Sequence, residues 1–158
     1  MTSRLLVDKI EGKTTSGTIQ MPVGHVIQTV TNEFSTDTST SSTSFQASGL
    51  IVSITPKFSN SKIIVTLTGG TQTWGSSAPT GTVNLYRQLT GGSYTSVVRL
   101  SYLTQNSTYG LSHSSMYVDT SHNTTSAINY QPYFKTNVGT YWFNYDQPIH
   151  LIAMEIAQ

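Results

Sequence analysis

From residue 24 onwards, apolar residues recur at every second position within short runs, which is the pattern of a half-buried β-strand. The runs GLIVSIT and KIIVTLT both follow it, and each has one apolar face: Leu50, Val52 and Ile54 in the first, and Ile63, Val65 and Leu67 in the second. The turn sequence PKFSNS separates them, because proline fixes the first bend and Asn-Ser tolerates the second. We predict that these two runs pair as a β-hairpin.

Similar runs continue to the C-terminus: TVNLYRQ, TSVVRLSYL, MYVDT, AINYQPYF, GTYWFNY and IHLIAMEI. Stretches rich in Ser, Thr and Gly predict a loop over 36–44, another over 69–81, and a loop or weak strand over 104–115. The spacing gives about eight or nine short strands, roughly ten residues apart, and no run has the period of a helix. An all-β sandwich or barrel is therefore predicted, as one domain over residues 24–158.

The first 23 residues differ from the rest because they contain no aromatic residue and only scattered aliphatic ones. Such a segment has no core of its own and needs a surface that another protein supplies. We predict an extended arm over residues 1–23 that attaches the domain to a larger assembly. Its contacts would come from the aliphatic side chains: Leu5, Leu6, Val7, Ile10 and Ile19.

The final run, IHLIAMEI, is apolar on both of its faces. A strand on the outside of a lone sandwich should alternate apolar with polar, so this strand needs cover on both sides. One side can be the domain's own core, and a second subunit, or else a loop of the same chain, covers the other. The candidate interface residues are Leu151, Ile152, Met154 and Ile156. Within this run, Glu155 is expected to be exposed at the chain end or to meet Lys or Arg across an interface.

The amino-acid composition limits which kinds of binding partner and site the chain can have. Charged residues make up 9% of the 158-residue chain and the net charge is +1, so no clustered basic footprint for nucleic acid is present. There is no cysteine, which excludes disulfides and Cys-ligated metals and favours assembly in a reducing cytoplasm. The first residues lack a signal-peptide pattern, and no stretch is long and apolar enough to insert into a membrane.

Catalytic and cofactor patterns are sparse. Ser112, His113 and Asp119 have the residue types of a hydrolase triad, but the serine lies outside a Gly-x-Ser-x-Gly turn. Asp119 and His122 could ligate a metal, yet no third or fourth ligand is evident. No cofactor fingerprint appears. We therefore expect neither an enzyme nor a cofactor.

Aromatic residues among Gly, Ser, Asn and Thr are typical of adaptable recognition surfaces. The candidates for host contact are Trp74, Tyr94 and Tyr109, in segments expected to gather at the end of the domain away from the arm. Tyr102 and Tyr117 could serve the same purpose, or they could be core residues on strands.

Several stretches carry a family resemblance: VDKIEGKTTSGTIQMPVGHVIQTV, SITPKFSNSKIIVTLTGG, NLYR, NTTSAINYQPYF and LIAMEIAQ. Together they resemble a family of bacteriophage virion proteins, abundant in marine phages, that are tail-fibre or structural proteins. The order of strands also resembles the jelly-roll domain of C1q and tumour-necrosis-factor ligands, which form compact trimers. The resemblance runs over nearly the whole chain and is weakest from Thr71 to Met116.

The resemblance implies a homotrimeric jelly-roll knob on a virion that is assembled in the cytoplasm of the host bacterium. Residues 7–18 would join the knob to tail or capsid proteins, and the knob would project towards a host-surface glycan or protein. No long shaft is present, so a short fibre, a tip subunit or a capsid decoration fits. Two alternatives come from other functional classes: a capsule-degrading tail spike and a soluble C1q-type ligand. The scarcity of acidic residues counts against the spike, and the missing signal peptide counts against the ligand.

Overall fold

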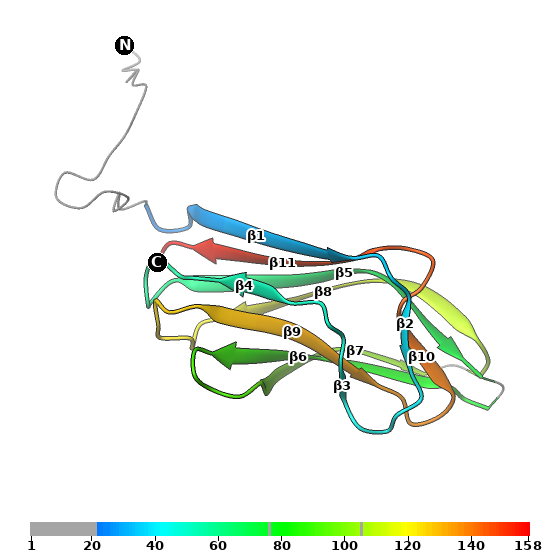
Figure 1. The fold of residues 1–158 in the computed structure, drawn as a ribbon. Coiled ribbons are helices and arrows are strands. Elements are labelled where there is room, and N and C mark those ends of the chain that lie inside the picture. Colours follow the sequence, from blue (N-terminus) through cyan, green and yellow to red (C-terminus); the bar gives the residue numbers. More distant parts are fainter. Residues whose placement is uncertain (1–21, 76, 105) are drawn as a thin grey trace, which may run out of the picture.

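The computed structural model describes residues 22–158 except 76 and 105, and the predicted arm (1–23) lies almost wholly outside them. The described residues form two antiparallel β-sheets packed face to face (Figure 1). The six-stranded sheet A contains β1 (Val26–Phe34), β2 (Thr38–Thr40), β5 (Lys62–Trp74), β8 (Tyr109–Asp119), β10 (Thr140–Asn144) and β11 (Ile149–Ile156). The five-stranded sheet B contains β3 (Gln46–Ala47), β4 (Val52–Ile54), β6 (Thr80–Leu89), β7 (Thr95–Thr104) and β9 (Ile128–Lys135).

The strand order is that of a jelly roll. In sheet A the long strands lie in the order β1-β11-β5-β8, and in sheet B they lie in the order β4-β9-β6-β7. The chain therefore passes between the sheets in two interlocked Greek keys. This arrangement confirms the predicted all-β jelly-roll class. Within the described ranges no helix is long and apolar enough to cross a membrane.

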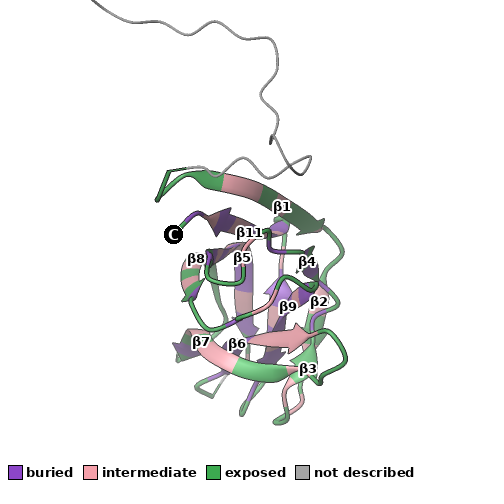
Figure 2. Cartoon of the chain, turned by 90° about the vertical axis from the view of Figure 1, so that its left-hand side faces the viewer, coloured by how far each residue is buried: buried purple, intermediate pink, exposed green. Residues whose placement is uncertain are grey.

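The core lies between the two sheets and uses the predicted inward faces. Leu50, Val52 and Ile54 are at most 1% exposed, and so are the side chains facing them: Ile63, Val65 and Leu67. Figure 2 shows the same division, with buried residues between the layers and exposed residues along β1. The alternation of apolar residues therefore predicted correctly which side chains form the core.

The predicted hairpin is wrong, because β4 and β5 belong to different sheets. β4 pairs with β9, whereas β5 pairs with β8, β10 and β11. The two apolar faces meet across the core instead of lying side by side. The segment between them is thus a crossing from one sheet to the other.

The predicted loops over 36–44 and 69–81 are partly strand, since β2 lies in the first, and the segment 104–115, predicted as a loop or weak strand, is strand from Tyr109 onwards. β5 continues through Gly69 and Gly70 to Trp74, and β8 begins already at Tyr109. Gly69 permits this extension because β11 approaches closely there: a Cβ on Gly69 would lie 2.6 Å from the Cα of Ile149. Glycine in these strands marks a close backbone approach, although in a sequence the same residue is also typical of loops.

Glu155 is buried within its own subunit, where it holds the segment between β4 and β5 in place by hydrogen bonds. Both predictions for it, exposure at the chain end and pairing with Lys or Arg across an interface, are therefore wrong. Its carboxylate accepts hydrogen bonds from the Lys57 backbone N–H at 2.8 Å, the Ser61 hydroxyl at 2.8 Å and the Gln28 amide at 2.6 Å. Its exposure is 0%. Burial raises the pKa of Glu155, but hydrogen bonds from Lys57, Gln28, Ser61 and Phe58 outweigh it and leave the pKa below its usual value.

A second buried carboxylate occupies the same rung of sheet A, since Ile63 is paired with Glu155 on one side and with Asp119 on the other. Asp119 accepts from Arg87 Nη1 at 2.7 Å and from the Tyr130 hydroxyl at 2.6 Å, which joins sheet A to sheet B. Burial raises the pKa of Asp119, but the hydrogen bonds from Tyr130, Arg87 and Ser121 lower it overall. This carboxylate is therefore a structural link between the layers.

Replacing Glu155 with Gln should destabilise the fold by about 2–3 kcal/mol, because an amide cannot accept from every donor that the carboxylate satisfies. Urea unfolding at fixed protein concentration measures the loss. Glu33→Gln is the control, since that side chain is 55% exposed, and its effect should stay within about 0.5 kcal/mol.

The loss of stability in Glu155→Gln should also depend on pH. A lowered pKa in the fold means that the stabilisation is present above the unfolded-state value of 4.5 and disappears as the pH falls through the lower folded value. The difference between parent and Glu155→Gln should therefore shrink below about pH 4. A difference that is the same at pH 7 and pH 3 would contradict the assigned role of this carboxylate.

Candidate functional site

The outer face of sheet A carries an apolar patch that spans three adjacent strands. Met154 of β11, Ile64 of β5 and Val118 of β8 lie in register, and the next rung holds Ile152, Thr66 and Met116. We call the following six residues the outer patch: Ile64, Met116, Val118, Ile152, Met154 and Ile156. Further along the strands the same face turns polar, with His150 3.6 Å from the Glu33 carboxylate.

The outer patch is open to solvent in the single chain. Met116 is 63% exposed and Val118 is 39% exposed, while its other four members are half-buried. A contiguous apolar surface of this kind is typical of an interface between proteins. It contains three of the four predicted interface residues. Leu151 is the exception and that assignment is wrong, because its side chain points inward and has 0% exposure in the chain's own core.

Both chain termini of the described domain lie at one end of the sandwich, which we call the near end (Figure 1). The Gly24 N–H donates to the Ala157 carbonyl, and the Ala157 N–H donates to the His25 carbonyl, each at 2.9 Å. These bonds hold the C-terminus in place beside the point where the chain enters β1. The predicted attachment residues of the arm, Leu5, Leu6, Val7, Ile10 and Ile19, lie outside the described residues.

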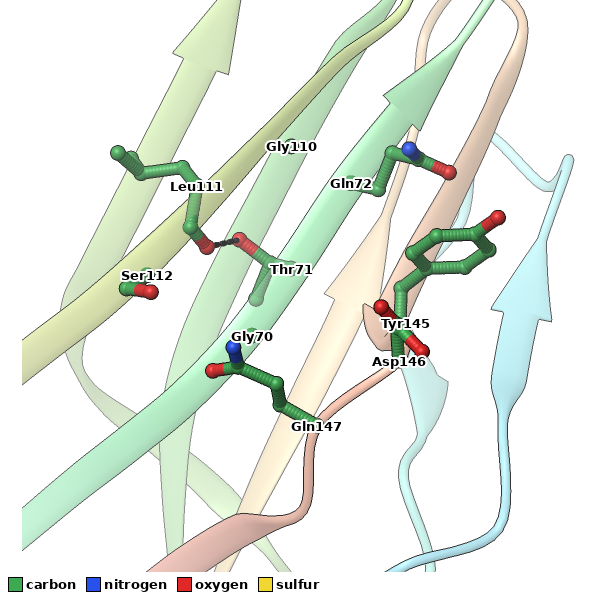
Figure 3. Close-up of a pocket in the computed structure, with 9 residues that line it drawn as sticks. All are labelled: Gly70, Thr71, Gln72, Gly110, Leu111, Ser112, Tyr145, Asp146 and Gln147. Atoms are coloured by element: carbon green, nitrogen blue, oxygen red, sulfur yellow. Dashed lines mark hydrogen bonds between the residues drawn. The ribbon is translucent and has the colours of Figure 1, made fainter.

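The opposite, distal end carries a polar pocket of about 260 Å³ between β5, β8 and the β10–β11 loop (Figure 3). Gly70 and Gly110 line it without side chains, and in Figure 3 the side chains of Gln72, Tyr145 and Gln147 stand opposite Ser112. The Tyr145 N–H donates to the Gly70 carbonyl at 3.4 Å, which brings the loop over β5. The pocket thus offers amide and hydroxyl groups and the Asp146 carboxylate for hydrogen bonding.

An aromatic cleft of about 350 Å³ adjoins this pocket and shares Tyr145 with it. Trp74 and Trp142 form its other main walls, and the rings of Trp142 and Tyr145 meet edge to face at 5.7 Å. Trp74 is 55% exposed, in agreement with its prediction as an accessible residue. Trp142 and Tyr145 were not among the residues predicted from the sequence. Side chains alternate between the two faces of a strand, and Tyr141 and Phe143 on either side of Trp142 are buried. Alternation within GTYWFNY could therefore have placed Trp142 on the outer face.

The predicted contact residues do not all share one end of the domain. Tyr109 begins β8 at the distal end, where it pairs with Thr73 beside Trp74, and it is 45% exposed. Tyr94 follows β6, which runs the length of sheet B, and so it lies at the near end (Figure 1). The shared location predicted for Tyr94 is therefore wrong. Of the two open cases, Tyr102 is 52% exposed and Tyr117 packs against the core.

The residues of the hypothetical triad and metal site are not brought together. Ser112 and His113 are neighbours on β8, so their side chains point to opposite faces, and Asp119 lies six positions further along, roughly 20 Å away. His113 is partly buried, and this burial lowers its pKa. His122 Nε2 contacts the Ser61 carbonyl oxygen at 2.8 Å. In the part of the chain that the structure describes, no three His, Cys, Asp or Glu side chains could jointly hold a metal.

Fold and surface together define an antiparallel jelly-roll sandwich with one apolar outer face. Neither a protein-family model nor a curated protein matches the chain. Two solved structures are similar in fold, those of the Gx and Gt strains of infectious bursal disease virus, at 15% and 14% identity and TM-scores of 0.41 and 0.39. Both matches cover 100% of this chain but 43% of the other one.

Proposed function

We propose that this protein is a non-enzymatic structural subunit of a bacteriophage virion and that it assembles as a homotrimer. The observation that carries the proposal is the outer patch, which leaves Met116 63% exposed on a sheet whose other face is already the core. Apolar side chains on both faces of β11 need cover from both sides. A second and a third copy, arranged around a closed axis, provide that cover without leaving an unpaired patch.

The position of the termini supports attachment through the arm. Residue 22 enters the domain at the near end, so the arms of a symmetric trimer would leave it at one end (Figure 1). The arm then binds tail or capsid proteins, as the family resemblance implies. The distal end, with Trp74, Tyr109 and the aromatic cleft, is directed away from the particle.

The distal end supports a host contact at the cell surface. Exposed aromatic rings beside amides and hydroxyls suit the recognition of a glycan or a protein, and three sites on one trimer raise avidity by roughly 10²–10⁴ when all can engage. A decoration subunit without receptor binding is the alternative within the same class, and the binding experiment below separates the two. A capsule-degrading spike is less well supported, because the two buried acids, Asp119 and Glu155, are both used in structural hydrogen bonds, and only one acid, Asp146, lines the distal pocket.

Light scattering should give a mass about three times 17.2 kDa for the full-length protein. Met154→Asp or Ile152→Asp should yield monomer or aggregate, because an unpaired charge at a buried interface is strongly destabilising. Ser53→Asp, on the exposed outer face of sheet B, is the matched control and should remain trimeric. A folded monomer of the unaltered protein would rule out the proposed assembly.

Deletion of residues 1–20 should leave the trimer intact and remove the protein from purified virions, since the arm supplies the attachment surface. Limited proteolysis should cut within this segment in the free protein and spare it on the particle. Western blotting of gradient-purified particles measures incorporation. Normal incorporation of the truncated protein would show that attachment runs through the jelly roll.

Trp74→Ala and Tyr109→Ala should lower binding of the purified protein to host cells by at least about tenfold, as expected when an aromatic anchor is truncated. Both side chains are largely exposed, so thermal unfolding should shift by no more than a few degrees. Val23→Ala, 75% exposed at the near end, is the control and should bind like the parent. Absence of binding by the parent would favour the decoration subunit.

A further inference from the structure

The outer face of sheet B carries two cations at neighbouring rungs. Lys135 of β9 and Tyr102 of β7 flank Thr82 of β6, and on the next rung Tyr133 and Arg99 flank Asn84. Residues from three strands and far-separated parts of the chain are thus gathered on one surface. Alternation places them all outward, because the intervening residues Val83 and Phe134 belong to the core.

Aromatic rings, rather than carboxylates, hold both cations. The Arg99 guanidinium carbon lies 5.6 Å from the centre of the Tyr102 ring, and Lys135 Nζ lies 5.1 Å from the centre of the Phe45 ring. Neither cation forms a salt bridge with any carboxylate in the described part of the chain, whereas Arg87 lies 2.7 Å from Asp119. Cation–π contacts orient the two side chains while their positive charges remain available to an anion.

A shallow cleft of about 510 Å³ lies between these side chains. Thr82, Asn84 and Asn137 line it with a hydroxyl and two amides. The Asn84 amide donates to the Ser96 hydroxyl at 3.1 Å, and its own carbonyl oxygen is buried without a hydrogen-bond partner among the described residues. The cleft therefore combines two positive charges, uncharged polar groups and no carboxylate.

A row of packed rings extends from one wall of the cleft. Phe45 contacts Tyr86 with ring centres 6.0 Å apart, Tyr86 stacks on Tyr133 at 4.1 Å, and Tyr133 meets Tyr94 at 5.9 Å. Mutual packing fixes these rings, so they offer a pre-organised surface at low entropic cost. This row also gives Tyr94 a role on the outer face of sheet B instead of at the distal end.

We propose that this cleft binds an acidic saccharide, a sugar chain that bears carboxylates. Arg99 and Lys135 pair with a carboxylate, the amides and the hydroxyl bind sugar hydroxyls, and the ring faces pack against the apolar C–H side of the pyranose. A single-stranded nucleic acid would also stack on aromatic rings, but it requires cations along a continuous backbone track. The cleft presents two cations, which matches one or two carboxylates better than a run of phosphates.

The location leaves the site open after assembly. The outer patch lies on sheet A and the cleft lies on the outer face of sheet B, so subunits that meet through the patch leave the cleft facing solvent. A trimer would then present three copies of the site around its side. The inference extends the proposed host contact to a second surface and a defined ligand class, and it does not require the Trp74 cleft to bind.

Calorimetric titration of the full-length protein tests the inference with oligosaccharides of galacturonate, glucuronate and sialic acid. Each is compared with its carboxyl-reduced counterpart, which keeps the hydroxyls and the ring. At least one acidic probe should bind, and its reduced form should bind at least about tenfold more weakly. Affinity should fall as sodium chloride is raised, because the contact is ionic.

Arg99→Gln and Lys135→Gln should each lower the affinity for the acidic probe about tenfold and leave the weak binding of the reduced form unchanged. Tyr102→Ala should weaken the binding of both the acidic probe and its reduced form. Lys57→Gln removes an exposed cation that does not line the cleft. It is the matched control and should change neither of the two affinities.

The inference is wrong if no acidic probe binds, if the Arg99→Gln/Lys135→Gln double variant binds like the parent, or if an octathymidylate strand binds more tightly than every saccharide. Light scattering on the same samples reports the oligomeric state separately. A trimer that binds no acidic saccharide therefore contradicts only this inference, while a monomer contradicts the proposed assembly.

Discussion

The packing of two antiparallel sheets around one core assigns every strand an inner and an outer face, and β11 is where this constraint matters most. It lies between β1 and β5 in sheet A, so it has no free edge along its paired length. Its inner side chains Ile149, Leu151 and Ala153 have 0% exposure and close the core. Its outer side chains continue in register into Ile64 and Val118, which turns an unusual terminal strand into a continuous apolar surface.

Buried polar groups cross-link the near end of the sandwich. Glu155 and Asp119 flank Ile63 on the same rung, and Ser61 donates to Glu155 while its carbonyl oxygen contacts His122. Such carboxylates would be costly without partners, but here donors from turns and from the opposite sheet satisfy them. The distal end also has buried hydrogen bonds, including one from the Thr136 hydroxyl to the Thr80 carbonyl at 2.6 Å, and it has open clefts lined by polar and aromatic groups.

Alternation in the sequence predicted which side chains face the core, because a period of two is a local property of an extended chain. It could not predict strand partners: β4 pairs with β9, more than seventy residues away, although β5 follows it directly. Glycine was misleading for a related reason, since Gly69 serves a close approach by Ile149 that only the tertiary fold creates. Trp74 was found from its local setting, whereas the cleft around it needed Trp142 and Tyr145 from β10 and the loop after it.

The two outer faces differ in chemistry, and the difference bears on how such a domain can be used. With only 9% charged residues, the chain has few ionic groups to spread over its surface. The outer patch of sheet A contains no charged residue. Sheet B places Arg99 and Lys135 over aromatic rings beside one cleft. An apolar face favours association with like surfaces through loss of water, and a cationic aromatic face favours a polar, anionic ligand that stays hydrated elsewhere. Because the faces lie on opposite sides of one core, the proposed assembly and the proposed ligand binding use different residues.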